Sequence, residues 1–81
     1  MKIRYEDGRV PQNADLLRRD IATQMRTTRK QLHLTQQALA DRAGTKKSNI
    51  SRMESGRYNP SLDFLVKVAD SMGKRIVIHM E

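Results

Sequence analysis

The chain contains no cysteine and no tryptophan, and aromatic residues make up only 4% of its 81 residues. Without cysteine it has neither a disulfide framework nor a thiolate metal site, which fits a reducing compartment. No apolar run approaches the roughly 18 residues that a membrane-spanning helix needs, and no signal-peptide core is present. We therefore expect a cytoplasmic protein without membrane association. A chain of this length forms one small domain with a modest core, for which oligomerisation is a natural supplement.

Residues suited to enzyme chemistry are also sparse. The two histidines, His33 and His79, lie far apart in the sequence, and neither stands at metal-ligand spacing from another histidine or an acidic cluster. No glycine-rich phosphate loop appears, and no serine has the surroundings of a nucleophile. We expect no enzyme activity, no metal and no cofactor.

Positive charge is what the chain has in excess: 16 lysines and arginines against nine acidic residues, for a net charge of +7. The excess is concentrated in residues 26–33 and 44–59, whereas residues 60–73 are slightly acidic. A solvated surface is one explanation for such charge. Where it coincides with a DNA-reading pattern, it indicates a footprint for phosphates instead.

Such a pattern lies between Leu34 and Pro60, where two short helical segments are separated by Gly44. In the second segment Ile50 and Met53, three residues apart, share one face. The other positions of that segment are basic or short and polar. A helix that is apolar on one side and basic on the other suits the DNA major groove. The two segments have the layout of a helix-turn-helix, in which the first helix supports the reading helix.

The chain here resembles the Xre, or lambda-repressor-like, helix-turn-helix regulators. The matching residues run through about half of the chain: Leu34-Thr35-Gln36, Leu39-Ala40, Ala43-Gly44, Ile50 to Arg57, Asn59 to Leu62, and Leu65. The resemblance implies an all-α, lambda-repressor-like domain of four helices, to which the sequence adds a short C-terminal β-strand. It also implies binding to double-stranded DNA.

Candidate contact residues follow from matching the family motif residue by residue. For base edges these are Lys47, Ser48 and Arg52, with Arg52 suited to a guanine. For the phosphate backbone they are Gln36, Lys46, Asn49, Arg57 and Asn59. We expect the acidic Glu54 to pair internally with an arginine rather than to contact DNA.

Helical periodicity and capping signals predict the element bounds. We expect helices over residues 14–31, 36–43, 46–55 and 62–72, with N-caps at Asn13, Thr35, Thr45 and Ser61. Gly44 supplies the left-handed residue that ends the second helix. In the first helix the apolar stripe is Leu17, Ile21, Met25 and Thr28, extended by Ala14 and Leu32. In the fourth it is Leu62, Leu65, Val68, Ala69 and Met72.

The two ends of the chain differ from this helical domain, which spans residues 14–73. We read residues 1–13 as an N-terminal arm, with a short strand at 2–5 or a partner-binding tail as alternatives and a turn at Asp7-Gly8. Residues 74–81 alternate like a strand with Ile76, Ile78 and Met80 on one face, which we assign to dimerisation. The strand must pair, either with residues 2–5 or, as we prefer, with a second copy across a two-fold axis.

These features predict a sequence-specific transcriptional repressor that binds a palindromic operator as a homodimer, near the nucleoid. Eighty-one residues leave no room for a ligand-sensing module, and small members with a terminal strand resemble antitoxins of the HipB or HigA kind. Those neutralise a cognate toxin and repress their own operon. The alternatives are a protein-interaction or coactivator-like module and a nonspecific nucleic-acid binder.

Overall fold

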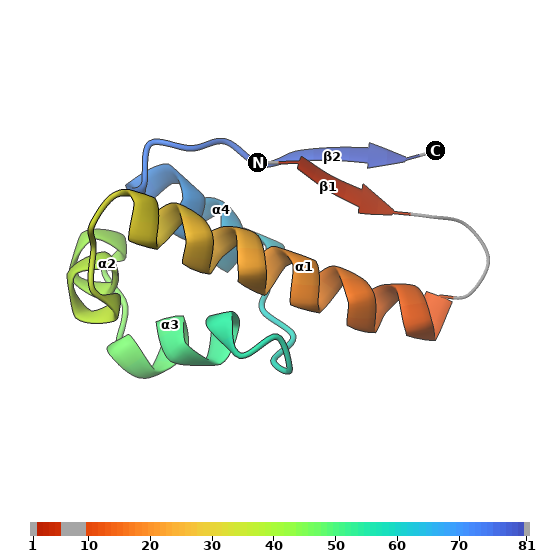
Figure 1. Cartoon of the computed structure of the whole chain (residues 1–81), viewed down its shortest axis with the longest axis horizontal. Helices are drawn as coiled ribbons and strands as arrows, with labels where there is room; N and C mark the ends of the chain where they lie inside the picture. The colour runs from red at the N-terminus through yellow and green to blue at the C-terminus, as the bar shows by residue number, and fades with distance from the viewer. Residues whose placement is uncertain (1, 6–9, 81) are drawn as a thin grey trace.

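In a computed structural model, backbone is described for residues 2–5 and 10–80, and side chains for residues 14–80. Four helices are followed by a strand that pairs with another strand near the N-terminus (Figure 1). The elements are β1 (Lys2–Tyr5), α1 (Val10–Gln31), α2 (Gln36–Ala43), α3 (Lys47–Glu54), α4 (Leu62–Ser71) and β2 (Val77–Met80). The predicted four-helix, lambda-repressor-like class with a C-terminal strand is confirmed. No helix in the described part of the chain is both long and apolar enough to cross a membrane.

The first helix is longer than the sequence pattern indicated. It starts at Val10, so the expected start at residue 14 with Asn13 as N-cap was wrong. Pro11 lies in the first turn, where a missing backbone N–H costs nothing because no intrahelical partner is available there. Of the segment read as an arm, residues 2–5 form β1 and residues 10–13 belong to α1. The expected Asp7-Gly8 turn lies outside the described residues.

Local signals fixed the bounds of α2 and the start of α4. The Thr35 hydroxyl accepts the backbone N–H of Ala38 at 3.0 Å, and the Ser61 hydroxyl accepts that of Phe64 at 3.0 Å. Both predicted N-caps are therefore confirmed. Gly44 ends α2 with φ 67° and ψ 39°, the left-handed conformation in which glycine has little penalty.

The core lies where the four helices meet. It contains residues from each helix: Met25, Leu39, Ala40, Ala43, Ile50, Met53, Leu65, Val68, Ala69 and Met72. Two expected core positions were wrong, because Leu62 is 52% exposed at the first residue of α4 and Leu32 is 40% exposed just after α1. Ala22, which the stripe omitted, is buried.

The two strands pair in parallel within the chain, with Lys2 opposite Val77 and Tyr5 opposite Met80. The alternative partner at residues 2–5 therefore pairs with one edge of β2, and pairing of β2 with a second copy stays a prediction. The strand also starts later than expected. Ile76 precedes it and packs against the core, whereas Ile78 is 52% and Met80 79% exposed.

Candidate nucleic-acid interface

Helix α3 has one buried and one open face. Ile50 and Met53 are almost completely buried against the core, with 0% and 2% exposure. On the opposite side Lys47, Ser48 and Arg52 are exposed. Ser48 and Arg52, four residues apart, are neighbours on the helix surface, and Lys47 precedes Ser48 at the start of the helix. The three residues assigned to base reading are thus brought together, and no hydrogen bond or ion pair to other described residues occupies their side chains.

The N-terminus of α3 is not capped as the sequence suggested. The N-cap position is Lys46, which makes no side-chain capping bond, so the assignment of Thr45 as N-cap was wrong. The Thr45 hydroxyl instead accepts a hydrogen bond from the Asn49 side-chain nitrogen at 3.0 Å. The first turn of α3 consequently has no side-chain acceptor at its N–H groups and has Lys46 and Lys47 beside it. Such a helix end favours an anion.

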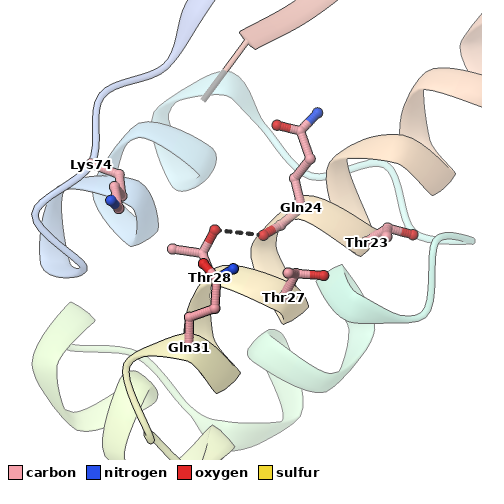
Figure 2. A pocket seen from close by; sticks show the side chains of 6 residues that line it. All are labelled: Thr23, Gln24, Thr27, Thr28, Gln31 and Lys74. Atoms are coloured by element: carbon pink, nitrogen blue, oxygen red, sulfur yellow. Dashed lines mark hydrogen bonds between the residues drawn. The ribbon is translucent and has the colours of Figure 1, made fainter.

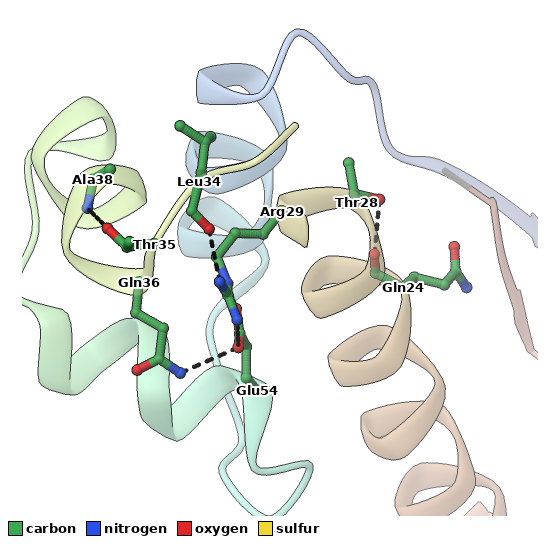
Figure 3. A network of polar contacts seen from close by, with 8 residues as sticks. All are labelled: Gln24, Thr28, Arg29, Leu34, Thr35, Gln36, Ala38 and Glu54. Carbon is green, nitrogen blue, oxygen red and sulfur yellow. Dashed lines mark hydrogen bonds and ion pairs between the residues drawn. The ribbon is translucent and has the colours of Figure 1, made fainter. Parts of the chain in front are cut away.

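A buried polar network holds α3 in place (Figure 3). Arg29 of α1 donates to both carboxylate oxygens of Glu54, from Nε at 2.7 Å and from Nη2 at 3.0 Å. Its Nη1 also donates to the Leu34 carbonyl at 2.7 Å. The expectation that Glu54 pairs with an arginine is confirmed. Because Glu54 is the last residue of α3, this network fixes the reading helix against α1 and the start of α2.

Gln36 belongs to the same network. Its Nε2 donates to the Glu54 carboxylate at 3.2 Å, and the residue is half-buried at the first position of α2. An amide has a second N–H and a carbonyl oxygen, so this bond leaves donor capacity for a phosphate. From the sequence, Gln36 was expected at the phosphate backbone, and Arg29 was counted only in the charge of residues 26–33. A basic residue twenty-five positions from its acidic partner gave no local signal of the pairing.

Two further candidates meet in a hollow of about 450 Å³ beside α3. Asn49 lines it from α3 and Asn59 from the α3–α4 loop, together with Tyr58, Pro60, Ser61 and Phe64. Arg57 in the same loop is exposed, and its backbone N–H donates to the Ser55 hydroxyl at 3.2 Å. The loop thus presents a cation and one amide beside a second amide on α3. This is a chemically suitable set for phosphate oxygens.

The residues assigned to dimerisation are not equivalent. Ile78 and Met80 belong to β2 and are exposed, whereas Ile76 is half-buried and packs on the core. Ile76 thus precedes the strand to which it was assigned, and the dimerisation role of the three residues stays a prediction. Its role in the described fold is to join the strand to the helical domain.

Comparison with known proteins gives the family. Residues 25–78 match the helix-turn-helix family HTH_3, and the chain therefore belongs to it. The resemblance to Xre or lambda-repressor-like regulators is confirmed. This is a family of regulators rather than enzymes, which agrees with the expected lack of enzyme activity.

Individual relatives agree with this assignment. The chain is 42% identical over 52 residues to an HTH-type transcriptional regulator of Methanothermobacter thermautotrophicus, covering 64% of this chain and 75% of the relative. It is 36% identical over 56 residues to the immunity repressor protein of Bacillus phage phi105, covering 69% of this chain and 39% of that protein. Among solved structures, an HTH_3 family transcriptional regulator from Vibrio cholerae superposes with a TM-score of 0.72 at 26% identity. That match covers 75% of this chain and about a third, 34%, of the other.

Proposed function

We propose that the chain is a transcriptional repressor that reads an operator sequence with α3. The observation that carries the proposal is the open face of α3, where Lys47, Ser48 and Arg52 are exposed while Ile50 and Met53 anchor the helix from behind. Arg52 can donate two bonds to a guanine, Lys47 can reach guanine acceptors, and Ser48 accepts or donates less selectively. The similarity to a phage immunity repressor supports repression over activation.

Backbone contacts would set the register of α3 in the groove. We assign them to Gln36 at the start of α2, Lys46 and Asn49 at α3, and Arg57 and Asn59 in the following loop. These residues lie at the start of α2, at α3 and in the loop after it, and phosphate contacts of this kind orient a protein without specifying sequence. Repression would follow when the bound protein occupies DNA that the polymerase needs, in the cytoplasm beside the nucleoid.

We further propose that two copies bind a palindromic operator. The parallel pair of β1 and β2 uses one edge of β2, and a two-stranded sheet by itself is only marginally stable. Antiparallel pairing of β2 with its copy across a two-fold axis would give a four-stranded sheet. The exposed side chains of Ile78 and Met80 would lie at that junction. A two-fold dimer matches a two-fold operator.

A narrower proposal is that the protein is the antitoxin of a toxin–antitoxin pair. The terminal strand after four helices supports it through the resemblance to HipB- and HigA-type antitoxins. The test is co-expression with the product of the adjacent gene. An antitoxin restores growth that this product arrests and co-purifies with it, whereas the absence of both effects refutes the narrower proposal and leaves the repressor intact.

The decisive experiment for DNA binding is a mobility shift with the protein's own promoter region at physiological salt, against scrambled competitor. A repressor yields a protected palindrome that resists the competitor. Equal binding to the scramble would refute sequence-specific reading and favour a nonspecific binder. Weak binding lost at moderate salt would favour a protein-interaction or coactivator-like module.

A further inference from the structure

Three cations form a row along one side of α1. Arg19, Arg26 and Lys30 are separated by seven and four residues, and this spacing puts them on one narrow stripe of the helix. All three are exposed. Between them on the same side lies Ala22, which is 3% exposed and packed into the fold. The row, named here the α1 ridge, therefore lies at the boundary between the packed side of α1 and solvent.

The α1 ridge runs beside the reading helix and the loop that follows it. Gly56, with φ +75°, comes so close to α1 that a Cβ built on it would lie 3.4 Å from the Arg19 Cα and 3.7 Å from the Ala22 Cβ. Towards the other end of the ridge, Arg29 bonds Glu54 of α3. The loop residue next to Gly56 is Arg57, which we assign to a phosphate. The ridge is thus continuous with the proposed DNA-facing surface.

Nearby carboxylates do not neutralise the ridge. Asp15, one turn before Arg19, pairs with Arg18 on the neighbouring side of the helix. Asp20 accepts a hydrogen bond from Gln24 at 2.9 Å, and Glu54 is buried against Arg29. Within the described part of the chain, the three ridge side chains have no hydrogen bond or ion pair. Three exposed like charges on one stripe repel one another, and a polyanion would relieve that repulsion.

We propose that Arg19, Arg26 and Lys30 form a second phosphate-binding surface, which grips the DNA backbone beside the phosphates assigned to Arg57. The inference rests on the proposed function, because it takes α3 to lie in the major groove. Long, flexible cationic side chains that follow a line can track successive phosphates without reading bases. The surface would strengthen binding to every sequence and leave sequence preference to α3.

The side of α1 that adjoins the ridge provides a contrast. There a groove of about 320 Å³ is lined by hydroxyl and amide side chains of α1, and Lys74 from the α4–β2 link is the one cation among the described residues that line it (Figure 2). Lys67 on α4 is likewise exposed and has no partner among the described residues. Replacing Lys67 and Lys74 removes the same charge as replacing two ridge residues, but at positions that do not belong to the ridge. These two lysines are therefore the matched control.

The test compares the salt dependence of DNA binding for Arg19→Gln/Arg26→Gln and for Lys67→Gln/Lys74→Gln, on operator and scrambled duplexes. For the ridge variant we expect the slope of log K against log salt to become shallower by roughly 0.9 per lost contact. Adding Lys30→Gln should remove one further contact. The ratio of operator to scrambled affinity should stay as in the wild type. All substitutions are at exposed positions, and circular dichroism melting checks that the fold is kept.

The outcomes separate this proposal from the one on which it rests. If the ridge and control variants change the slope equally, only net charge matters and the ridge is refuted. If the ridge variant changes the operator-to-scramble ratio, the ridge reads sequence and the phosphate assignment is wrong. If the wild type has no sequence preference but the ridge variant still flattens the slope, the repressor proposal fails and the ridge stands. Binding to an acidic protein instead of any duplex would overturn both.

The position of the α1 ridge on the DNA backbone can be tested separately. Ethylating single phosphates of the operator should interfere with wild-type binding at a group of sites next to those lost in Arg57→Ala, because Gly56, the neighbour of Arg57 in the chain, lies close to Arg19. In the ridge variant these neighbouring sites should stop interfering. Unchanged interference at all sites would refute the placement of the ridge on the backbone.

Discussion

The guanidinium of Arg29 and the carboxylate of Glu54 meet inside the domain, with side-chain exposures of 10% and 4%. Replacing Arg29 with methionine would leave the carboxylate buried without its partner. We expect Arg29→Met to lower the free energy of unfolding by about 3–5 kcal/mol, measured by urea denaturation. Arg18→Met is the control, because its more exposed pair with Asp15 should contribute less than about 1 kcal/mol.

A double variant tests the reason for that loss. If an uncompensated charge causes it, Arg29→Met/Glu54→Leu should recover much of the lost stability, since apolar replacements of a buried pair are often tolerated. A double variant as unstable as Arg29→Met alone would contradict this explanation. It would indicate that the bonds to the Leu34 carbonyl and Gln36 matter more than the charge itself.

Replacing Arg52 and replacing Arg57 should change DNA binding in different ways. Arg52→Ala should reduce operator affinity by roughly 1–3 kcal/mol and relax the preference at one base pair, because a bidentate contact to a base is lost. Arg57→Ala should weaken operator and scramble by the same factor, because a phosphate contact carries no sequence information. Competition titrations on both duplexes measure the two ratios. Unchanged discrimination in Arg52→Ala would mean that the reading face has been assigned wrongly.

At the scale of elements, two glycines end helices with positive φ but in different surroundings. Around Gly44 a Cβ would have open space, so Gly44→Ala should cost only the backbone penalty of about 1–2 kcal/mol, and Gly44→Asn less. Around Gly56 the Cβ would lie 3.4 Å from the Arg19 Cα, at the tight end of van der Waals contact with backbone that cannot rotate away. Gly56→Ala should therefore be the more destabilising in urea denaturation. Equal losses would contradict the close approach of this turn to α1.

Features set by nearby residues and features set by distant contacts also differ in how well the sequence predicted them. Thr35, Ser61 and Gly44 act on residues within a turn of themselves, and their roles were predictable. Thr45 was mistaken for a cap because the capping position moved by one residue to Lys46. The early start of α1 was missed since a proline in the first turn looks the same in sequence whether it precedes or begins a helix.

Features that depend on contacts between distant residues were harder to predict from the sequence. Periodicity identified the two faces of α3 and therefore the exposed base-reading candidates. It could not assign Arg29 to Glu54, nor identify β1 as a partner of β2, because both depend on how remote segments come together. The same limit explains Ile76, whose alternation with Ile78 suggested a strand face until its packing on the core was known.

At the scale of the whole molecule, shape bears on how two copies read DNA. The domain measures 38 × 21 × 20 Å, with α1 along its length (Figure 1). Half-sites of a palindrome recur about every 34–36 Å, one helical turn. Two copies of this size can therefore occupy successive major grooves on one face of the duplex. A single copy would use only half of the contacts and forgo the gain from linking two sites.

Charging the exposed face of β2 tests this arrangement. Ile78→Lys/Met80→Lys alters side chains that are 52% and 79% exposed, so the folded monomer should persist. Two added lysines would face their copies across a two-fold junction, and their repulsion should keep the protein monomeric in sedimentation equilibrium. Operator affinity should then fall by about a hundredfold or more, while affinity for an isolated half-site stays the same. Leu16→Lys, at an exposed position of α1, is the control that should leave the dimer intact. A β2 variant that remains dimeric would move the junction to another face, because two like charges at a two-fold axis cannot be avoided by a small shift of register.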